Sequence, residues 1–123
     1  MKRVLIADDA SFMRQMIRDI IEPEGFEVVG EAADGVDVVE KYRKLHPDVV
    51  MMDIVMPKRS GIDAVKAIHA EDATARVVMC SALGQEALVT EAIQAGAQDF
   101  IVKPFKPDAV LATLRKVVEK ADQ

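Results

Sequence analysis

The chain has 123 residues, of which 50% are apolar and 30% charged, a balance that predicts a folded domain with a buried core and argues against disorder. The formal net charge of −5 argues against the basic surface with which proteins bind the phosphates of nucleic acids. The apolar run after Arg3 is too short for a signal peptide or a membrane span, so we expect a cytoplasmic protein without nucleic acid or membrane partners.

Short β-branched apolar runs alternate along the chain with longer segments whose apolar residues recur at helical spacing. Strands are expected at residues 3–7, 27–31, 49–52, 76–80 and 100–102. The first helix, which Pro23 and Gly25 would end, is expected to bury a wide stripe formed by Phe12, Met13, Met16, Ile17, Ile20 and Ile21. The later helices are expected from Asp34 to before Pro47, from about Gly61, over residues 85–95 and from Pro107.

Five repeats of a strand followed by a helix predict a parallel sheet, because parallel strands need crossover connections. Since these crossovers are right-handed and place helices on both faces, the expected fold is a doubly wound α/β sheet with five strands and five helices. We expect residues 1–123 to form one domain.

Ligands of open α/β sheets bind outside the carboxyl ends of the strands. The residues expected there are Asp8, Asp9, Asp53, Ser81 and Lys103. Three neighbouring carboxylates would repel one another without a cation, and all-oxygen sites suit hard ions such as Mg²⁺, Mn²⁺ or Ca²⁺. A lysine and a hydroxyl suit phosphoryl oxygens, and a carboxylate can act as a nucleophile, so the set predicts a phosphoryl-transfer site.

Each of these residues also has a simpler structural explanation. Asp8 and Asp9 could cap the first helix, and Ser81 could cap the fourth. Asp53 could be a solvated strand end, and Lys103 could be an ordinary surface lysine. Their joint placement at four strand ends of one sheet favours the functional interpretation.

The runs Val4-Leu5-Ile6-Ala7-Asp8-Asp9, Met52-Asp53-Ile54-Val55-Met56-Pro57 through Gly61, Cys80-Ser81-Ala82 and Asp99-Phe100-Ile101-Val102-Lys103-Pro104-Phe105 occur in order. Together they resemble the response-regulator receiver domains, and specifically the single-domain CheY-like chemotaxis regulators, over nearly the whole chain. The resemblance implies a flavodoxin-like strand order of 2-1-3-4-5. It also implies that Asp53 accepts phosphate from a histidine kinase, and that Ser81 and Lys103 contact the phosphoryl group.

The resemblance further implies that Mg²⁺ is held by Asp9, Asp53 and the backbone carbonyl of Val55, with Asp8 acting through water. The Lys103-Pro104 peptide would be cis. On phosphorylation Ser81 would move towards the phosphoryl oxygens and Phe100 would fill the space that it leaves, although a phenylalanine in a strand is more often simply part of the core.

The resulting function is that of a phosphorylation-activated switch of a two-component system, not an enzyme beyond its own phosphorylation and dephosphorylation. We expect a monomer whose fourth helix, fifth strand and fifth helix bind a flagellar motor switch protein, and whose phosphate a phosphatase removes. The alternatives are a phosphorelay intermediate, a receiver with a non-motor target, a flavodoxin relative or a free-standing phosphatase. The chain has no glycine-rich phosphate loop, which argues against the last two.

Two features depart from the usual pattern of these domains. Lys58 and Arg59 add positive charge near Asp53, and we hypothesise that they steer an acidic kinase surface or phosphodonor towards it, although exposed loops more often carry such charges without a special role. Val55 and Leu83 are apolar and cannot orient an attacking water, which predicts slow self-dephosphorylation.

Overall fold

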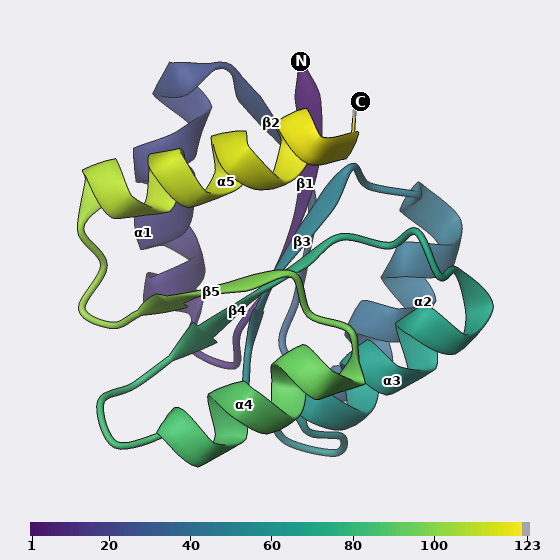
Figure 1. The fold of residues 1–123 in the computed structure, drawn as a ribbon. Helices are drawn as coiled ribbons and strands as arrows, with labels where there is room; N and C mark the ends of the chain where they lie inside the picture. The colour runs from purple at the N-terminus through teal and green to yellow at the C-terminus, as the bar shows by residue number, and fades with distance from the viewer. Residues whose placement is uncertain (122–123) are drawn as a thin grey trace.

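The computed structural model describes residues 1–121 and consists of a five-stranded parallel sheet between two layers of helices (Figure 1). The strands are β1 (Lys2–Ala7), β2 (Phe26–Ala32), β3 (Val49–Asp53), β4 (Val77–Ser81) and β5 (Asp99–Val102), in the order β2-β1-β3-β4-β5. The helices are α1 (Ser11–Ile21), α2 (Gly35–Leu45), α3 (Gly61–Glu71), α4 (Glu86–Ala95) and α5 (Pro107–Ala121), with a short 3-10 turn η1 (Glu22–Glu24) after α1. The predicted fold class and strand order are confirmed.

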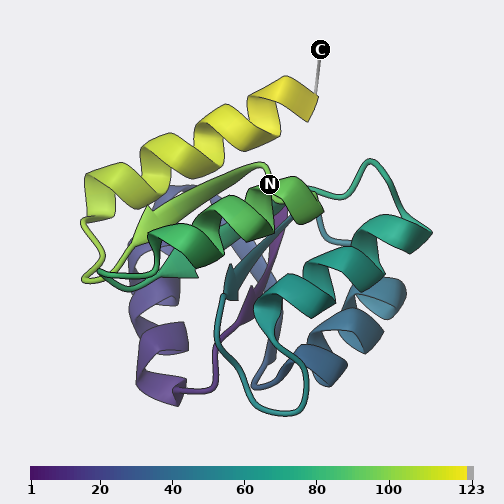
Figure 2. The ribbon, with the colours of Figure 1, turned by 60° about the horizontal axis from the view of Figure 1, so that its bottom comes forward.

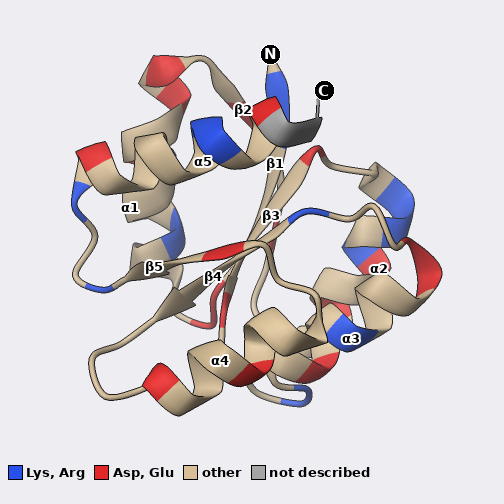
Figure 3. Cartoon of the chain, in the orientation of Figure 1, with Lys and Arg blue, Asp and Glu red and all other residues tan. Residues whose placement is uncertain are grey.

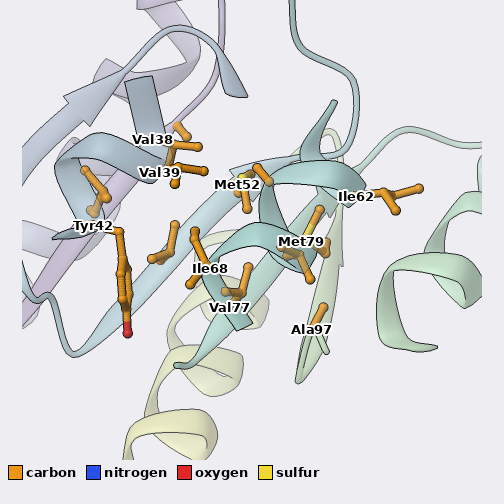
Figure 4. Close-up of a cluster of buried hydrophobic side chains, with 14 of the residues drawn as sticks. Val38, Val39, Tyr42, Met52, Ile62, Ile68, Val77, Met79 and Ala97 are labelled. Carbon is orange, nitrogen blue, oxygen red and sulfur yellow. The ribbon is translucent and has the colours of Figure 1, made fainter. Parts of the chain in front are cut away.

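Helices α1 and α5 cover one face of the sheet, and α2, α3 and α4 cover the other (Figure 2). Successive strand residues point to opposite faces, so Val4 and Ile6 pack under α1 and α5 whereas Leu5 and Ala7 pack under α2 and α3. Both sets are buried, which explains why the central strands are continuously apolar. Figure 4 shows the core on the α2 and α3 side.

Side chains cap the N-termini of α2 and α3, the ends of these helices that lie at the carboxyl edge of the sheet. Asp34 caps α2 by accepting hydrogen bonds from the backbone N–H groups of Val36 and Asp37, as predicted. Ser60 caps α3 by accepting from the N–H of Asp63 at 3.1 Å. None of the helices within residues 1–121 has the length and apolar character that a membrane crossing requires.

The stripe predicted for α1 is only partly buried. Ile17 and Ile21 are buried, but Phe12 is 68% exposed and Met16 41% exposed. A helix lying on a sheet buries a limited sector of its surface, and Phe12 and Met16, four residues apart, lie together on the flank of that sector. The prediction that both face the core was therefore wrong.

Candidate functional site

The adjacent strands β1 and β3 bring three carboxylates together. Ala7 pairs with Met52 at the end of the ladder, so the residues that follow leave the sheet side by side. One oxygen from each of Asp8, Asp9 and Asp53 lies within 4.8 Å of the other two. Asp8 is only 1% exposed, whereas Asp53 is half-buried and Asp9 is exposed. The carboxylates expected at these strand ends therefore do converge.

Lys103, which follows β5, supplies the cation of this crevice. Its Nζ donates to Asp8 Oδ2 at 2.9 Å and to Asp53 Oδ2 at 3.1 Å. Burial acts to lower the pKa of Lys103, but the hydrogen bonds to Asp8 and Asp53 outweigh it and leave the pKa raised. Lys103 is thus a charged partner of two carboxylates rather than a surface lysine. The Lys103–Pro104 peptide is cis, as the resemblance implied.

The electrostatics of Asp53 indicate a site short of positive charge. Burial raises the pKa of the Asp53 carboxyl, and the neighbouring Asp8 acts in the same direction, while Lys103 offsets part of the rise. One ammonium group cannot balance three carboxylates. An acidic, all-oxygen donor set with one exposed side fits a hard divalent cation, and Mg²⁺ typically binds through one or two carboxylates, water and substrate phosphate. These residues therefore fit Mg²⁺.

The loop after β3 is built by close backbone packing. The N–H of Gly61 donates to the carbonyl of Ile54 at 2.7 Å, and a Cβ on Gly61 would lie 2.2 Å from the carbonyl oxygen of Asp53, so only glycine fits. Lys58 extends from this loop to Asp34, with 3.6 Å between Nζ and Oδ2. The charge of Lys58 is therefore already paired with Asp34, the cap of α2. The steering role of Lys58 and Arg59 stays a prediction.

Ser81 is the buried last residue of β4. The N-cap of α4 is Gln85, so the alternative that Ser81 caps this helix is wrong. Asp53 pairs with Cys80, which places Ser81 one residue further along the neighbouring strand. Beside Ser81 lies a cavity of about 270 Å³ that Phe100 also lines. Phe100 is 42% exposed, so the alternative that it is simply part of the core is wrong as well.

Two charged residues beside the crevice were not singled out from the sequence. Arg14 Nη1 donates to the backbone carbonyl of Asp8 at 2.6 Å, and Arg14 Nε donates to Glu31 Oε1 at 2.8 Å. Glu31 lies in β2, and no local motif links it to α1. Only the pairing of β2 with β1 brings these side chains together, so a spacing rule could not have identified them.

Comparison with known proteins agrees with this geometry. The family model described as "Response regulator receiver domain" matches residues 4–115. The chain is 59% identical to the chemotaxis protein CheY of Thermotoga maritima, over 94% of this chain and 97% of the relative. It is 57% identical to the chemotaxis protein CheY of Bacillus subtilis, with the same coverage of both chains, 94% and 97%.

Solved structures extend the likeness to three dimensions. The response regulator domain of Thermotoga maritima CheB superposes with a TM-score of 0.90 at 40% identity, covering 97% of each chain. CheY in a CheX–CheY–BeF3–Mg²⁺ complex from Borrelia burgdorferi superposes with a TM-score of 0.90 at 42% identity, covering 94% of this chain and 88% of that one. The family match, the high identity over almost the whole chain and the shared fold establish that this chain belongs to the response regulator receiver domain family.

Proposed function

We propose that the protein is a phosphorylation-activated switch of chemotactic two-component signalling that accepts a phosphoryl group on Asp53. The observation that carries this proposal is the single crevice in which Asp53 lies between Asp8, Asp9 and Lys103. The two CheY relatives, at 57% and 59% identity, support the chemotactic assignment. As a receiver domain the protein is a phosphoryl-accepting switch rather than a conventional enzyme, which argues against a flavodoxin relative or a free-standing phosphatase.

In the transfer step a carboxylate oxygen of Asp53 attacks the phosphorus of a phosphohistidine or an acyl phosphate. A new P–O bond forms, and the P–N or P–O bond to the donor breaks, so that the leaving group takes the electron pair. Lys103 Nζ, which lies 3.1 Å from Asp53 Oδ2, would donate to a phosphoryl oxygen, as would the Ser81 hydroxyl after moving towards the phosphoryl group. Mg²⁺, when bound by Asp9, Asp53 and the Val55 carbonyl with Asp8 acting through water, would neutralise the carboxylates and the incoming phosphoryl oxygens.

Intact mass spectrometry tests the phosphoacceptor. The protein is incubated with acetyl phosphate, with Mg²⁺ or with EDTA, beside an Asp53→Asn control. We expect a gain of one phosphoryl mass that requires Mg²⁺ and is lost in the control. A gain that persists in Asp53→Asn would place the phosphoryl group elsewhere. No gain, together with no binding of beryllofluoride, would refute the function proposed for the crevice.

The cavity beside Ser81 supports a conformational response to phosphorylation. Its lining includes Ser81, Val89, Phe100 and Val102, and the side chain of Phe100 is partly exposed to solvent. If Ser81 moves towards the phosphoryl oxygens, Phe100 can turn into the space and reshape the surface between α4 and β5. The chain lacks tryptophan, so Phe100→Trp gives a single fluorescent reporter. Its emission should shift to shorter wavelength with beryllofluoride and Mg²⁺, and an unchanged spectrum would contradict the movement.

The surface of α4, β5 and α5 is the proposed docking site for a target such as a flagellar motor switch protein. Ile93, Phe100 and Val102 are exposed apolar side chains on it, and exposed Leu83 lies in the turn that precedes α4. The charges of α4 are acidic only (Figure 3), whereas α5 carries Arg115 and Lys116, so basic groups on a target would pair with the α4 side of this surface. Among the solved relatives, CheY of Borrelia burgdorferi has been captured with its partner CheX. A histidine kinase and a phosphatase are the other proposed partners.

Competing roles within the same family are separable by phosphotransfer. A phosphorelay intermediate would pass its label to a histidine phosphotransferase, whereas a motor-directed switch would keep it and gain affinity for its target. Neither transfer nor motor binding would indicate a non-motor target. We further propose a cytoplasmic monomer in which residues 1–123 form one receiver domain, and the family match over residues 4–115 supports the domain assignment.

A further inference from the structure

The carbonyl group of Asp8 is held by an arginine from the following helix. Arg14 lies in the first turn of α1, and its Nη1 donates to the Asp8 carbonyl at 2.6 Å. Its side chain is only 17% exposed. Placing a guanidinium group largely out of water is costly unless its donors are satisfied, so the environment of Arg14 must supply specific acceptors.

Glu31 fixes the orientation of the Arg14 side chain. Its Oε1 accepts from Arg14 Nε at 2.8 Å, and its Oε2 accepts from Arg18 Nε at 2.6 Å. Burial acts to raise the pKa of Glu31, but the hydrogen bonds from Arg18 and Arg14 outweigh it and leave the pKa lowered. The Arg14 guanidinium is thus held at two points, by an ionised carboxylate and by the Asp8 carbonyl, and its plane is fixed.

The contact matters because Asp8 is where β1 leaves the sheet. Ala7 is the last residue of β1 paired with β3, and the N–H of Asp8 still donates to Ala32 on the other side at 3.0 Å. The Asp8 carbonyl belongs to the peptide unit that carries Asp9. Because a peptide unit is planar, fixing this carbonyl fixes the direction in which Asp9 continues.

We infer that Arg14, directed by Glu31, is a positioning residue for the cation site: it orients the Asp8–Asp9 peptide so that both carboxylates face Asp53. The inference rests on the proposed function, in which those carboxylates hold Mg²⁺. As a cation, Arg14 would by itself oppose a divalent ion nearby. Its ion pair with Glu31 offsets that charge, so its remaining effect is to hold the turn ready for the metal.

A matched pair of substitutions separates orientation from charge. Arg14→Lys keeps the charge but replaces the rigid guanidinium, whose Nε and Nη1 donate separately to Glu31 and to the Asp8 carbonyl, by a single freely rotating ammonium group. Arg18→Lys is the control. Arg18 lies on the same helix as Arg14 and also donates to Glu31, but its other hydrogen bond in the described part of the chain goes to Glu22 and not to Asp8. Mg²⁺ affinity is measured by isothermal titration, and urea unfolding in EDTA shows that each variant is folded.

We expect Arg14→Lys to weaken Mg²⁺ binding about tenfold or more, the usual effect of removing a residue that orients a metal ligand, and Arg18→Lys to change it less than about twofold. Equal affinities for Arg14→Lys and the wild type would overturn the inference. So would equal losses in the two variants, because the effect would then belong to the ion pair and not to the Asp8 carbonyl.

Glu31→Gln provides a second route if Arg14→Lys does not fold. It leaves the arginine charge unbalanced and loosens its orientation, so it should also weaken Mg²⁺ binding, and unchanged affinity would contradict the role given to Glu31. A wild-type protein that binds no Mg²⁺ would instead refute the proposed metal site, an outcome distinct from binding that is insensitive to Arg14.

Discussion

Replacing Asp9 by asparagine should stabilise the metal-free protein and remove most of its response to Mg²⁺. Asp9 is the exposed member of three carboxylates whose nearest oxygens lie within 4.8 Å of one another. Lys103 is hydrogen-bonded to the other two, Asp8 and Asp53. Asparagine keeps the size of the side chain and removes its charge, so the change relieves repulsion without disturbing the packing.

The magnitude follows from the spacing of the charges. At this distance two unit charges repel by about 1 kcal/mol in water and by about 3–4 kcal/mol at an effective dielectric constant of 20. Because Asp9 is exposed, we take the lower energy for its repulsion with each of the two other carboxylates, and the positive charge of Lys103 offsets part of that repulsion. The free energy of unfolding in EDTA should therefore rise by about 1–2 kcal/mol.

Urea unfolding followed by circular dichroism measures this change in EDTA and in Mg²⁺. Wild-type protein should gain about 2.7 kcal/mol when Mg²⁺ is at a hundredfold its dissociation constant, and Asp9→Asn should gain far less at that concentration. Asp19→Asn, an exposed substitution on α1, is the control and should change neither value appreciably. A less stable Asp9→Asn protein in EDTA would refute the electrostatic reasoning, and an unchanged Mg²⁺ response would refute the metal site.

Elsewhere in the chain, Cys80 should resist thiol reagents until urea unfolds the protein, because burial raises its pKa to about 12; stoichiometric labelling of native protein would contradict this. Ile68→Ala should cost about 2–5 kcal/mol of unfolding free energy, because Ile68 is fully buried in the core of Figure 4, and a loss below 1 kcal/mol would mean that the core refills the space. Asp34→Ala should cost about 0.5–2 kcal/mol through loss of the α2 cap, and an unchanged urea midpoint would show the cap to be dispensable. Exposed Val55 and Leu83 offer no group to orient water, so phosphorylated protein should lose its phosphoryl group slowly, and a half-life of seconds by intact mass would count against this.

The order of strands and helices was predictable because the local pattern and the tertiary structure agree. Apolar runs of four or five residues are long enough for strands, and Asp34 and Gly96 mark helix ends through local chemistry. The meeting of Asp8 and Asp53 followed from topology, since neighbouring parallel strands end at the same edge. Ser60 was missed as a cap although Asp63, three residues later, completes a recognisable capping pattern.

What could not be predicted depends on contacts between distant segments. The exposure of Phe12 depends on which sector of α1 the rest of the fold covers, and helical periodicity gives only the direction of a side chain. The pairing of Arg14 with Glu31 depends on β2 lying next to β1. The exposure of Phe100 depends on the space left between β5 and α4. In each case the residue type was known, but its neighbours were not.

The charge balance of the crevice also sets an order of events. Three carboxylates and the single ammonium of Lys103 leave an excess of two negative charges, which is the charge that one divalent cation neutralises. An anionic phosphodonor approaching the metal-free crevice would meet this excess and be repelled. Lys103 cannot remove the repulsion, because its single positive charge, shared between Asp8 and Asp53, is already included in this balance. Phosphorylation should therefore require prior cation binding, and any residue that holds Asp8 and Asp9 in place influences the rate at which Asp53 can react.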